Sequence, residues 1–342
     1  MTTPFDCHDA NQRLVIALGD PAGIGMEVTL KALADPQRPA HISPLLVGCR
    51  ASLERTAQLL RERTQAPVAD PDDLEVDDQP IPGGPLEPGT AGSISGAVSF
   101  QWLTRAVQLV QQGQGRALVT APIAKHAWHA AGHRYPGQTE RLAELDGGQQ
   151  ASMLFTALSP QTGWRLNTLL ATTHIPLSSV PTALTPERLE RRLNQLENFC
   201  RRFSQRPRLR VAGLNPHAGE AGQLGTEEQR WISACLQRFQ QLQSNLQLEG
   251  PVPPDTCWLG AAQAWNDSKH LDEGCDGYLA LYHDQGLIPV KLLAFDQAVN
   301  TTLGLPFLRT SPDHGTGFDR AGQGSARGAS MLAAIDTAVE LG

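Results

Sequence analysis

Side chains that could bind a metal ion or an anion are concentrated between Tyr282 and Gly322. The ionisable and amide side chains of this stretch include His283, Asp284, Lys291, Asn300, Arg309, Asp313, His314 and Asp319. Imidazoles and carboxylates can bind metals or move protons, and lysine and arginine can hold an anion. Apolar runs such as LIPVKLLAF and LGLPFL separate these groups. The pattern predicts short strands and turns that present functional side chains at their ends.

Three histidines, His174, His217 and His283, each follow an apolar run of strand length. In an open parallel sheet, ligands bind at the carboxyl ends of the strands. Three imidazoles gathered there can bind a divalent cation and leave one coordination position for a substrate. The spacing fits no local metal motif, so a structural role for each histidine stays open beside the metal site.

A glycine-containing loop opens a predicted helix at YPGQTERLAEL, residues 135–145. Gln138, Thr139 and Arg141 are placed to bind an anion at the amino terminus of that helix. The alternative is ordinary helix capping, with Thr139 as the cap and Glu140 in the first turn. The sequence favours neither interpretation.

The elements that must position these residues alternate between strands and helices. Predicted strands open the segments 13–35, 41–48, 116–123, 165–181, 208–232 and 277–286. Helical spacing follows most of them, and Thr185 with Pro186 is a typical helix start. The first unit ends its strand in GDPAGIG, which fits neither GxGxxG nor a P-loop. Residues 66–92 are rich in Pro, Gly and Asp and predict an irregular surface segment. The fold class is therefore α/β.

Composition limits the classes of function. The chain has 342 residues, enough for two domains or one large α/β unit. Its net charge of −7 argues against a protein that binds nucleic acids non-specifically. The helical spacing of the basic run Arg188–Arg210 predicts a solvent-exposed helix face. Six scattered cysteines without a CxxC pair indicate neither a zinc-thiolate site nor a disulfide framework. We expect no secretory signal at MTTPFDCHDANQR and no membrane span, and hence a cytoplasmic protein.

Several segments together resemble one family. They are LGDPAGIGMEVTLKAL, VTAPIAKHAWHAAG, YPGQTERLAEL, ATTHIPLSSV, GLNPHAGE, YHDQGLIPVK and VNTTLGLPFLRTSPDHGTGFDRAG. They occur in the family's order and cover nearly the whole chain. The sequence resembles the 4-hydroxythreonine-4-phosphate dehydrogenase family, PdxA, of pyridoxal phosphate biosynthesis.

The resemblance implies a two-domain α/β/α fold like isocitrate and isopropylmalate dehydrogenases. The expected domains are 1–130 with 295–342, on the NAD side, and 131–294, on the metal and dimerisation side. It also implies a homodimer, with the active site in the interdomain cleft at the dimer interface. Neither a nucleic acid nor a membrane is an expected partner.

The family's site residues carry over by motif. The implied metal ligands are His174, His217 and His283, one of them from the partner subunit. The implied substrate contacts are Gln138, Thr139, Lys291, Asn300 and Arg309, with Asp255 in PPDT. The implied NAD contacts are Asp313, His314 and Gly315. From the chemistry of the reaction, we expect Lys291 or Asp284 to accept the proton. Three departures stand out: Gln138 where many members have histidine, Met26 where proline is usual, and a longer segment at 259–272.

The resemblance implies oxidation of 4-phosphooxy-L-threonine by NAD or NADP with one divalent metal ion, Zn²⁺, Mg²⁺ or Co²⁺. The 3-keto acid formed would decarboxylate to 3-amino-2-oxopropyl phosphate. The alternatives are a dehydrogenase for D-threonate or D-erythronate 4-phosphate, a phosphate acyltransferase of similar fold, and a metal-binding structural protein. An acyltransferase should lack the three histidines, and a structural protein needs no anion-binding side chains.

Overall fold

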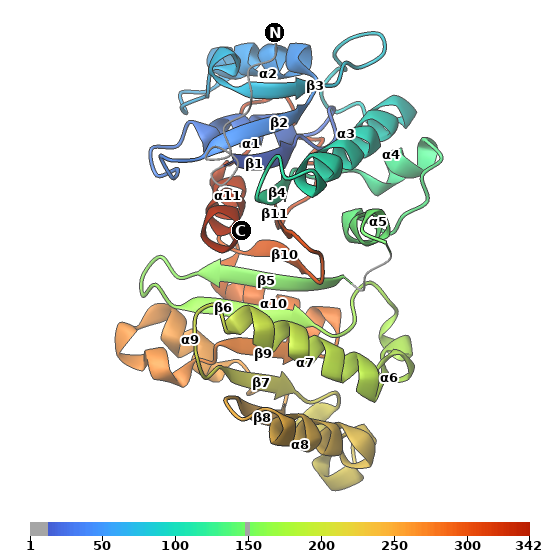
Figure 1. The fold of residues 1–342 in the computed structure, drawn as a ribbon, viewed down its shortest axis with the longest axis vertical. Coiled ribbons are helices and arrows are strands. Elements are labelled where there is room, and N and C mark those ends of the chain that lie inside the picture. Colours follow the sequence, from blue (N-terminus) through green and yellow to red (C-terminus); the bar gives the residue numbers. More distant parts are fainter. Residues whose placement is uncertain (1–12, 148–150) are drawn as a thin grey trace. The chain divides into compact units, whose positions relative to one another are not determined.

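The computed structural model describes residues 13–147 and 151–342. The N-terminal segment, for which we expected no secretory signal, lies outside this part. The chain forms two compact units, one of residues up to Ala151 together with Val299–Gly342, and one of Ser152–Ala298. Residues 131–147, expected in the central domain, belong to the first unit, where helix α5 (Gln138–Leu145) contacts α3 (Ser93–Gln111). Each unit has its own α/β layers (Figure 1).

The first unit is built on a mostly parallel run of strands in the order β3-β2-β1-β4-β11-β10. The strands are β1 (Arg13–Ala17), β2 (Ser43–Gly48), β3 (Glu75–Asp78), β4 (Ala117–Thr120), β10 (Val299–Leu303) and β11 (Leu308–Pro312). Only the β10–β11 pair among them is antiparallel. Strand β1 is buried along its whole length, as expected for an apolar strand with neighbours on both sides.

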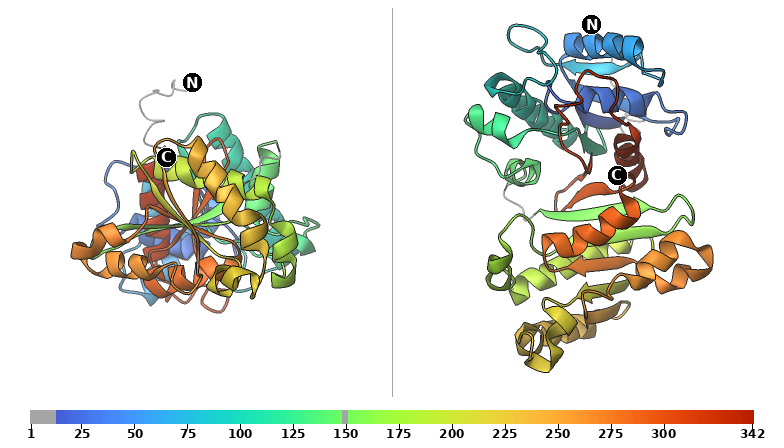
Figure 2. Two further views of the ribbon diagram at one scale, coloured as in Figure 1. Left: turned by 90° about the horizontal axis from the view of Figure 1, so that it is seen from below. Right: turned by 180° about the vertical axis from the view of Figure 1, so that it is seen from behind.

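Helices cover this sheet. They are α1 (Gly25–Leu33), α2 (Arg50–Arg63), α3, α4 (Lys125–Ala130), α5 and α11 (Ala329–Leu341). Helix α3 packs against β1, β2 and β4, whereas α11 packs against β4, β10 and β11 and also contacts α1. The view from behind in Figure 2 shows α11 beside α1. Trp102 of α3 and Trp128 of α4 are fully buried. Trp128 Nε1 donates to the Ser99 hydroxyl of α3 at 3.0 Å, and Trp102 Nε1 donates to the Gln79 carbonyl at 3.2 Å.

The loop after β1 is held tightly against two other loops of the same unit. The amide of Asp20 donates to the carbonyl of Pro122 at 2.9 Å, and that of Ile24 donates to the carbonyl of Thr316 at 2.9 Å. Gly19 has a φ of +74°, and a Cβ there would lie 2.4 Å from the Pro122 oxygen. Only glycine fits such a close approach in this conformation. The loops that follow β1, β4 and β11 therefore meet at one edge.

The second unit contains the strands in the order β5-β6-β9-β7-β8, parallel except for the β5–β6 pair. The strands are β5 (Ser152–Leu158), β6 (Arg165–Leu170), β7 (Arg208–Ala212), β8 (Gln247–Val252) and β9 (Gly277–Ala280). The helices are α6 (Val180–Ala183), α7 (Pro186–Cys200), α8 (Ser233–Leu242), α9 (Leu259–Asn266) and α10 (His283–Ala294). Figure 1 shows α7 and α10 on opposite sides of β6 and β9.

The predicted helix start at Thr185 is confirmed. Thr185 caps α7, because its hydroxyl accepts from the amide of Arg188 at 3.3 Å. The cysteines of the described residues, Cys49, Cys200, Cys235, Cys257 and Cys275, are all free. Among the described residues, no helix is both long and apolar enough to cross a membrane.

Two predictions were wrong. Residues 66–92 contain the strand β3, whose sequence EVDD is exposed at both ends and lacks the alternation that marks a strand. LIPVKLLAF is not a short strand but part of helix α10, with Pro289 inside it. The prediction failed because Pro289 and the neighbouring β-branched and apolar residues are typical of a strand rather than a helix. The buried side of α10, which includes Leu287 and Val290, packs on the sheet.

Helix α11 carries a carboxylate in an unfavourable place. Burial, and then the charges of Asp35 and Glu340, raise the pKa of Asp336 to about 6. Its Oδ1 is enclosed and has no hydrogen-bond partner among the described residues. A folded-state pKa above the ordinary value of 3.8 means that the folded state binds the proton more tightly. Ionised Asp336 therefore destabilises the fold above pH 6.

Replacing Asp336 with asparagine should stabilise the protein by about 1 kcal/mol above pH 7, with partial solvent contact taken into account. The gain should shrink as the pH falls through 6 and vanish near pH 4, where folded and unfolded chains are both protonated. Urea denaturation over this pH range measures it. Asp35→Asn should give a smaller gain, and a pH-independent gain in Asp336→Asn would contradict the assignment.

Candidate active site

Arg309 is a buried cation without a carboxylate partner among the described residues. It lies in β11 and is 2% exposed. Its Nε and Nη2 donate to the Thr120 hydroxyl at 3.0 and 2.6 Å, and its Nη1 donates to the Thr302 hydroxyl at 3.2 Å. The register of β10 and β11 pairs Thr302 with Arg309, and Thr120 ends the neighbouring strand β4. Two neutral hydroxyls hold the guanidinium without neutralising it.

Burial removes water from the Arg309 guanidinium and makes its protonated, charged form less stable. Burial lowers the pKa of Arg309 to about 10, and the carboxylate of Glu140 partly opposes the shift. The guanidinium is therefore still charged at neutral pH, in surroundings that raise the energy of that charge. An anion bound beside it would be strongly favoured.

Gln138 reaches the same point of the sheet from helix α5. Its Nε2 donates to the carbonyl of Ala121 at 3.2 Å, one residue beyond the Thr120 that holds Arg309. Its Oε1 is enclosed and has no partner among the described residues, and the same is true of Asn300 Oδ1 in β10. The structure thus brings Gln138 and Arg309 to consecutive residues at the end of β4.

The other residues at the start of α5 have clear roles. The helix begins at Gln138, and its cap residue is Gly137, so Thr139 is not the cap. Glu140 does occupy the first turn. Arg141 pairs with Glu144 at 2.9 Å and lies 4.6 Å over the Phe100 ring, which ties it to the fold. Thr139 lies in the first turn of this helix, whereas Arg141 is engaged with Glu144 and Phe100.

Two residues of this region were missed in the sequence. A methyl group on Gly137 would lie 3.9 Å from Lys125 Nζ, so the exposed Lys125 stands beside Gly137, the residue before Gln138. Asp20 is fully buried, and its carboxylate accepts from the Ala22 amide at 2.9 Å and the Ser95 hydroxyl at 3.2 Å. Burial raises the pKa of Asp20. A charged side chain soon after an apolar strand was the available signal for both.

In the second unit, His174 and His283 lie side by side, with ring centroids 5.4 Å apart. His174 follows β6 and His283 follows β9, and these strands are parallel neighbours. Gly286 lets α10 approach them, since a Cβ there would meet Leu170 and Ala280 at 2.6 and 2.9 Å. His283 Nδ1 lies 2.7 Å from the Asp284 carboxylate. A carboxylate behind an imidazole is the usual arrangement for a histidine that binds a metal.

His217 is not gathered with the other two. It follows β7, the other neighbour of β9, but its side chain is exposed on the Pro216–Gly222 segment. In the part of the chain described, no three histidine, cysteine, aspartate or glutamate side chains come close enough to hold a metal ion. Within the described residues of one chain, two of the three predicted metal ligands, His174 and His283, lie together.

The backbone around His217 is unusual. His217, Ala218, Glu220 and Ala221 have φ values between +43° and +52°. Non-glycine residues in this left-handed region are strained. The buried Glu228 holds the preceding turn, because its Oε1 accepts from the amides of Leu214 and Asn215, each at 2.8 Å.

The remaining predicted residues are divided between the units. Lys291 lies on α10, 5.4 Å over the Phe295 ring, and Asp255 is exposed on a turn. Asp313, His314 and Gly315 follow β11 in the first unit, where His314 Nδ1 lies 2.9 Å from the Gly315 carbonyl. The next residue, Thr316, is the one that holds the loop after β1.

Comparison with known proteins gives the family. Residues 40–338 match the family model described as pyridoxal phosphate biosynthetic protein PdxA. The chain belongs to the PdxA family. It is 76% identical over 330 residues to the 4-hydroxythreonine-4-phosphate dehydrogenase of Synechococcus sp. (strain RCC307), covering 96% of this chain and 99% of that protein. It is therefore related to dehydrogenases, which are oxidoreductases.

The chain is also similar to more distant proteins and to solved structures. The D-threonate 4-phosphate dehydrogenase of Pectobacterium atrosepticum is 35% identical over 96% of this chain and 98% of its own. The crystal structure of 4-hydroxythreonine-4-phosphate dehydrogenase from Klebsiella pneumoniae matches with a TM-score of 0.78 and 36% identity, covering 96% of this chain and 97% of that one. A branched-chain phosphotransacylase from Enterococcus faecalis, at 12% identity and a TM-score of 0.56 over 96% of this chain and 98% of its own, shares the fold alone.

Arg309→Met should raise the KM for a phosphorylated substrate by about 100-fold, because two or three charge-assisted hydrogen bonds are lost. The melting temperature without ligand should not fall, because the variant no longer buries an unpaired charge. Inorganic phosphate should raise the melting temperature of the natural protein but not of the variant. Arg206→Met, which removes an exposed arginine of the other unit, is the matched control. Equal stabilisation of all three proteins by phosphate would exclude Arg309 from the anion site.

Proposed function

We propose that this protein oxidises 4-phosphooxy-L-threonine to 2-amino-3-oxo-4-phosphooxybutanoate, using NAD or NADP. The product then loses CO2 to give 3-amino-2-oxopropyl phosphate, a step of pyridoxine 5'-phosphate biosynthesis. Membership of the PdxA family and 76% identity to a protein of that name support the reaction. The structural observation that carries the proposal is the buried Arg309 guanidinium, which has only hydroxyl partners among the described residues.

The substrate's anionic groups are assigned to the first unit. Arg309 and Asn300 would bind the phosphate or carboxylate, together with Gln138 and Thr139 at the start of α5. Gln138 cannot carry a charge, so Lys125 beside it would supply the second cation. A catalytically silent structural protein would have no reason to bury an arginine in this way.

The proton transfer is assigned to the second unit. Asp284 lies within hydrogen-bond distance of His283 Nδ1 and would fix the orientation of that imidazole. Lys291 is then the proposed acceptor of the hydroxyl proton, with Asp284 as the alternative. A divalent ion held by the histidines, Zn²⁺, Mg²⁺ or Co²⁺, would lower the pKa of the substrate hydroxyl, and bound NAD or NADP would accept the hydride. Asp255 and the 313–315 residues would contact substrate and cofactor respectively.

A second copy of the chain would complete the site. Ile288, Leu292 and Phe295 are 59%, 80% and 63% exposed on successive turns at the end of α10. An apolar strip of this kind on a helix is typical of an association surface. The separation of His217 from the other two predicted ligands within one chain points the same way, and we propose that His217 of each subunit serves the site of the other. The protein would act as a homodimer in the cytoplasm.

The first test is NADH formation from 4-phosphooxy-L-threonine, with and without chelator and with Zn²⁺ or Mg²⁺ restored. We expect turnover that the chelator abolishes and the metal restores, and loss of nearly all turnover in His174→Ala. D-threonate 4-phosphate is the comparison substrate, because the Pectobacterium atrosepticum relative bears that name. A higher kcat/KM for the sugar acid would replace the proposed substrate, and full turnover by metal-free enzyme would exclude the metal site.

Mixed dimers test the shared site. His217→Ala and His283→Ala subunits, each inactive alone, should regain roughly a quarter of natural activity on mixing, because half the dimers then have one intact site of two. His174→Ala mixed with His283→Ala is the control and should stay inactive, because both residues serve the same site from one chain. Recovery in the control pair, or none in the test pair, would overturn the assignment of His217 to the partner.

A further inference from the structure

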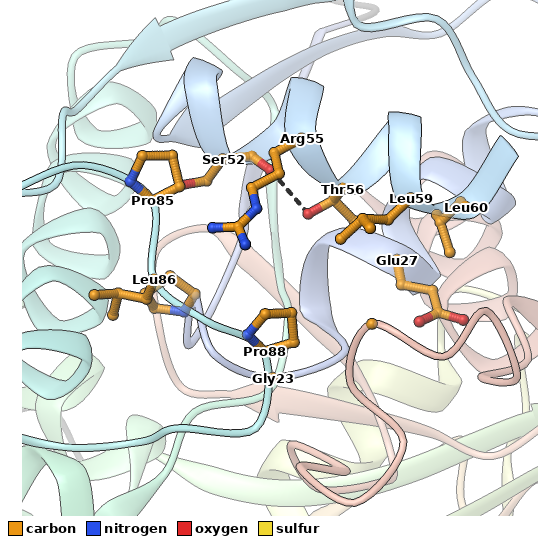
Figure 3. A pocket seen from close by; sticks show the side chains of 12 residues that line it. Gly23, Glu27, Ser52, Arg55, Thr56, Leu59, Leu60, Pro85, Leu86 and Pro88 are labelled. Carbon is orange, nitrogen blue, oxygen red and sulfur yellow. Dashed lines mark hydrogen bonds between the residues drawn. The ribbon is translucent and has the colours of Figure 1, made fainter. Parts of the chain in front are cut away.

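The pocket between α1, α2 and the 85–88 segment is small (Figure 3). Its lining includes Glu27 and Ser52, whose side chains each have one enclosed oxygen without a hydrogen-bond partner among the described residues. Water would satisfy both oxygens, whereas the space is too small for an organic ligand. The pocket therefore adds no ligand to the proposed reaction.

Helix α5 carries two of the proposed substrate contacts, Gln138 and Thr139, but it has little apolar anchorage. All eight of its residues are described, and of them only Leu142 is buried. Two turns of helix are not stable in isolation. Contacts other than apolar packing must therefore fix this helix, and with it the position of the Gln138 amide.

Arg141, on the turn of α5 that follows Gln138, joins this helix to α3. Its guanidinium carbon lies 4.6 Å from the centre of the Phe100 ring, and its Nη2 donates to the Thr104 hydroxyl at 3.3 Å. Phe100 and Thr104 lie one turn apart on α3. Within α5, Nη1 of Arg141 donates to the Glu144 carboxylate at 2.9 Å. A guanidinium is attracted by the electron-rich face of an aromatic ring, so Arg141 holds α5 against α3.

The Phe100 ring is itself packed between other rings. The imidazole of His133 stacks on it, with centroids 3.6 Å apart and planes within 3°, and the indole of Trp128 meets it edge-on at 5.2 Å. Trp128 is fully buried, so the ring rests on the core of the first unit. Burial, and then the charge of Arg141, lower the pKa of His133. This imidazole is therefore neutral at neutral pH and does not repel the guanidinium.

We propose that Arg141 is a positioning residue for the anionic group of the substrate and acts through helix α5. Its contact with Phe100 fixes the start of that helix. From there Gln138 donates to the Ala121 carbonyl at 3.2 Å, beside the strand end that holds Arg309. Arg141 itself touches no substrate atom, since its guanidinium is engaged by contacts within the protein. The inference rests on the proposed function, because the phosphorylated substrate is the anion that α5 meets.

Binding of inorganic phosphate to the intact protein, measured by calorimetry, tests this role without any reaction. Phe100→Leu removes the ring but no charge, and it should weaken phosphate binding about fivefold through the loss of one cation–π contact. The KM for the phosphorylated substrate should rise by the same factor, while kcat and the KM for NAD stay unchanged. Phe203→Leu is the matched control, because Arg165 lies 4.8 Å over that ring in the second unit. It should leave phosphate binding unchanged.

Arg141→Met provides a second variant, which should weaken phosphate binding about tenfold. Arg141→Lys keeps a cation beside the ring and should recover most of that loss. In a protein that already carries Gln138→Ala and Thr139→Ala, Arg141→Met should have no more than about a twofold further effect, because Arg141 acts through those two residues. A loss of about tenfold that persists in this background would overturn the positioning role, because Arg141 would then contact the anion directly.

Unchanged phosphate binding in Phe100→Leu, or no phosphate binding by the natural protein, would also overturn the proposal. The proposed reaction can fail separately. If 4-phosphooxy-L-threonine is not turned over while phosphate binding still depends on Phe100 and Arg141 but not on Phe203, the reaction is wrong and the positioning role stands.

Discussion

The first unit contains a buried guanidinium, that of Arg309, whose positive charge no hydrogen-bond partner among the described residues neutralises. Arg309 is held by hydroxyls of Thr120 and Thr302, which satisfy its hydrogen bonds but leave its charge. Such a side chain destabilises the ligand-free protein and favours any anion that can reach it. Strand β11, which carries Arg309, pairs with β10 on one side and with β4 on the other, and these neighbours supply Thr302 and Thr120. Helix α5 brings Gln138 to Ala121, the residue after Thr120. In the proposed site, binding energy for the substrate would thus be stored in the fold before the substrate arrives.

In the second unit, the sheet brings two imidazoles, those of His174 and His283, close together. His174 and His283 are far apart in the chain but follow neighbouring parallel strands, and this pairing helps to bring their ring centroids to 5.4 Å. Gly286 allows α10 to lie close to those strands, and Gln285 fixes its start by donating to the Gly213 carbonyl at 2.7 Å. The same helix presents an apolar strip to its surroundings. One element therefore serves both the proposed metal site and the proposed dimer.

Much of this arrangement could be predicted because strand ends are visible in the sequence. Apolar runs followed by His174, His217 and His283 placed the histidines at the sheet edge, and the order of motifs gave the family. Other features depended on tertiary context. Strand β3 has an acidic, exposed sequence and exists only because it pairs with β2. Helix α10 contains Pro289 and a run typical of a strand. Lys125 and Asp20 each follow an apolar strand, but their place in the site region depends on contacts with residues of other elements.

The left-handed turn at His217 restricts which sequences this loop can accept. Four non-glycine residues with positive φ make glycine or asparagine acceptable at Ala218 and Ala221, whereas valine or isoleucine would be strongly disfavoured. Glu228, which holds the turn from a different element, must then be preserved along with the histidine. Divergence of this segment should accordingly proceed through coordinated changes in two places. Single substitutions to β-branched residues there would be eliminated even where the imidazole itself is untouched.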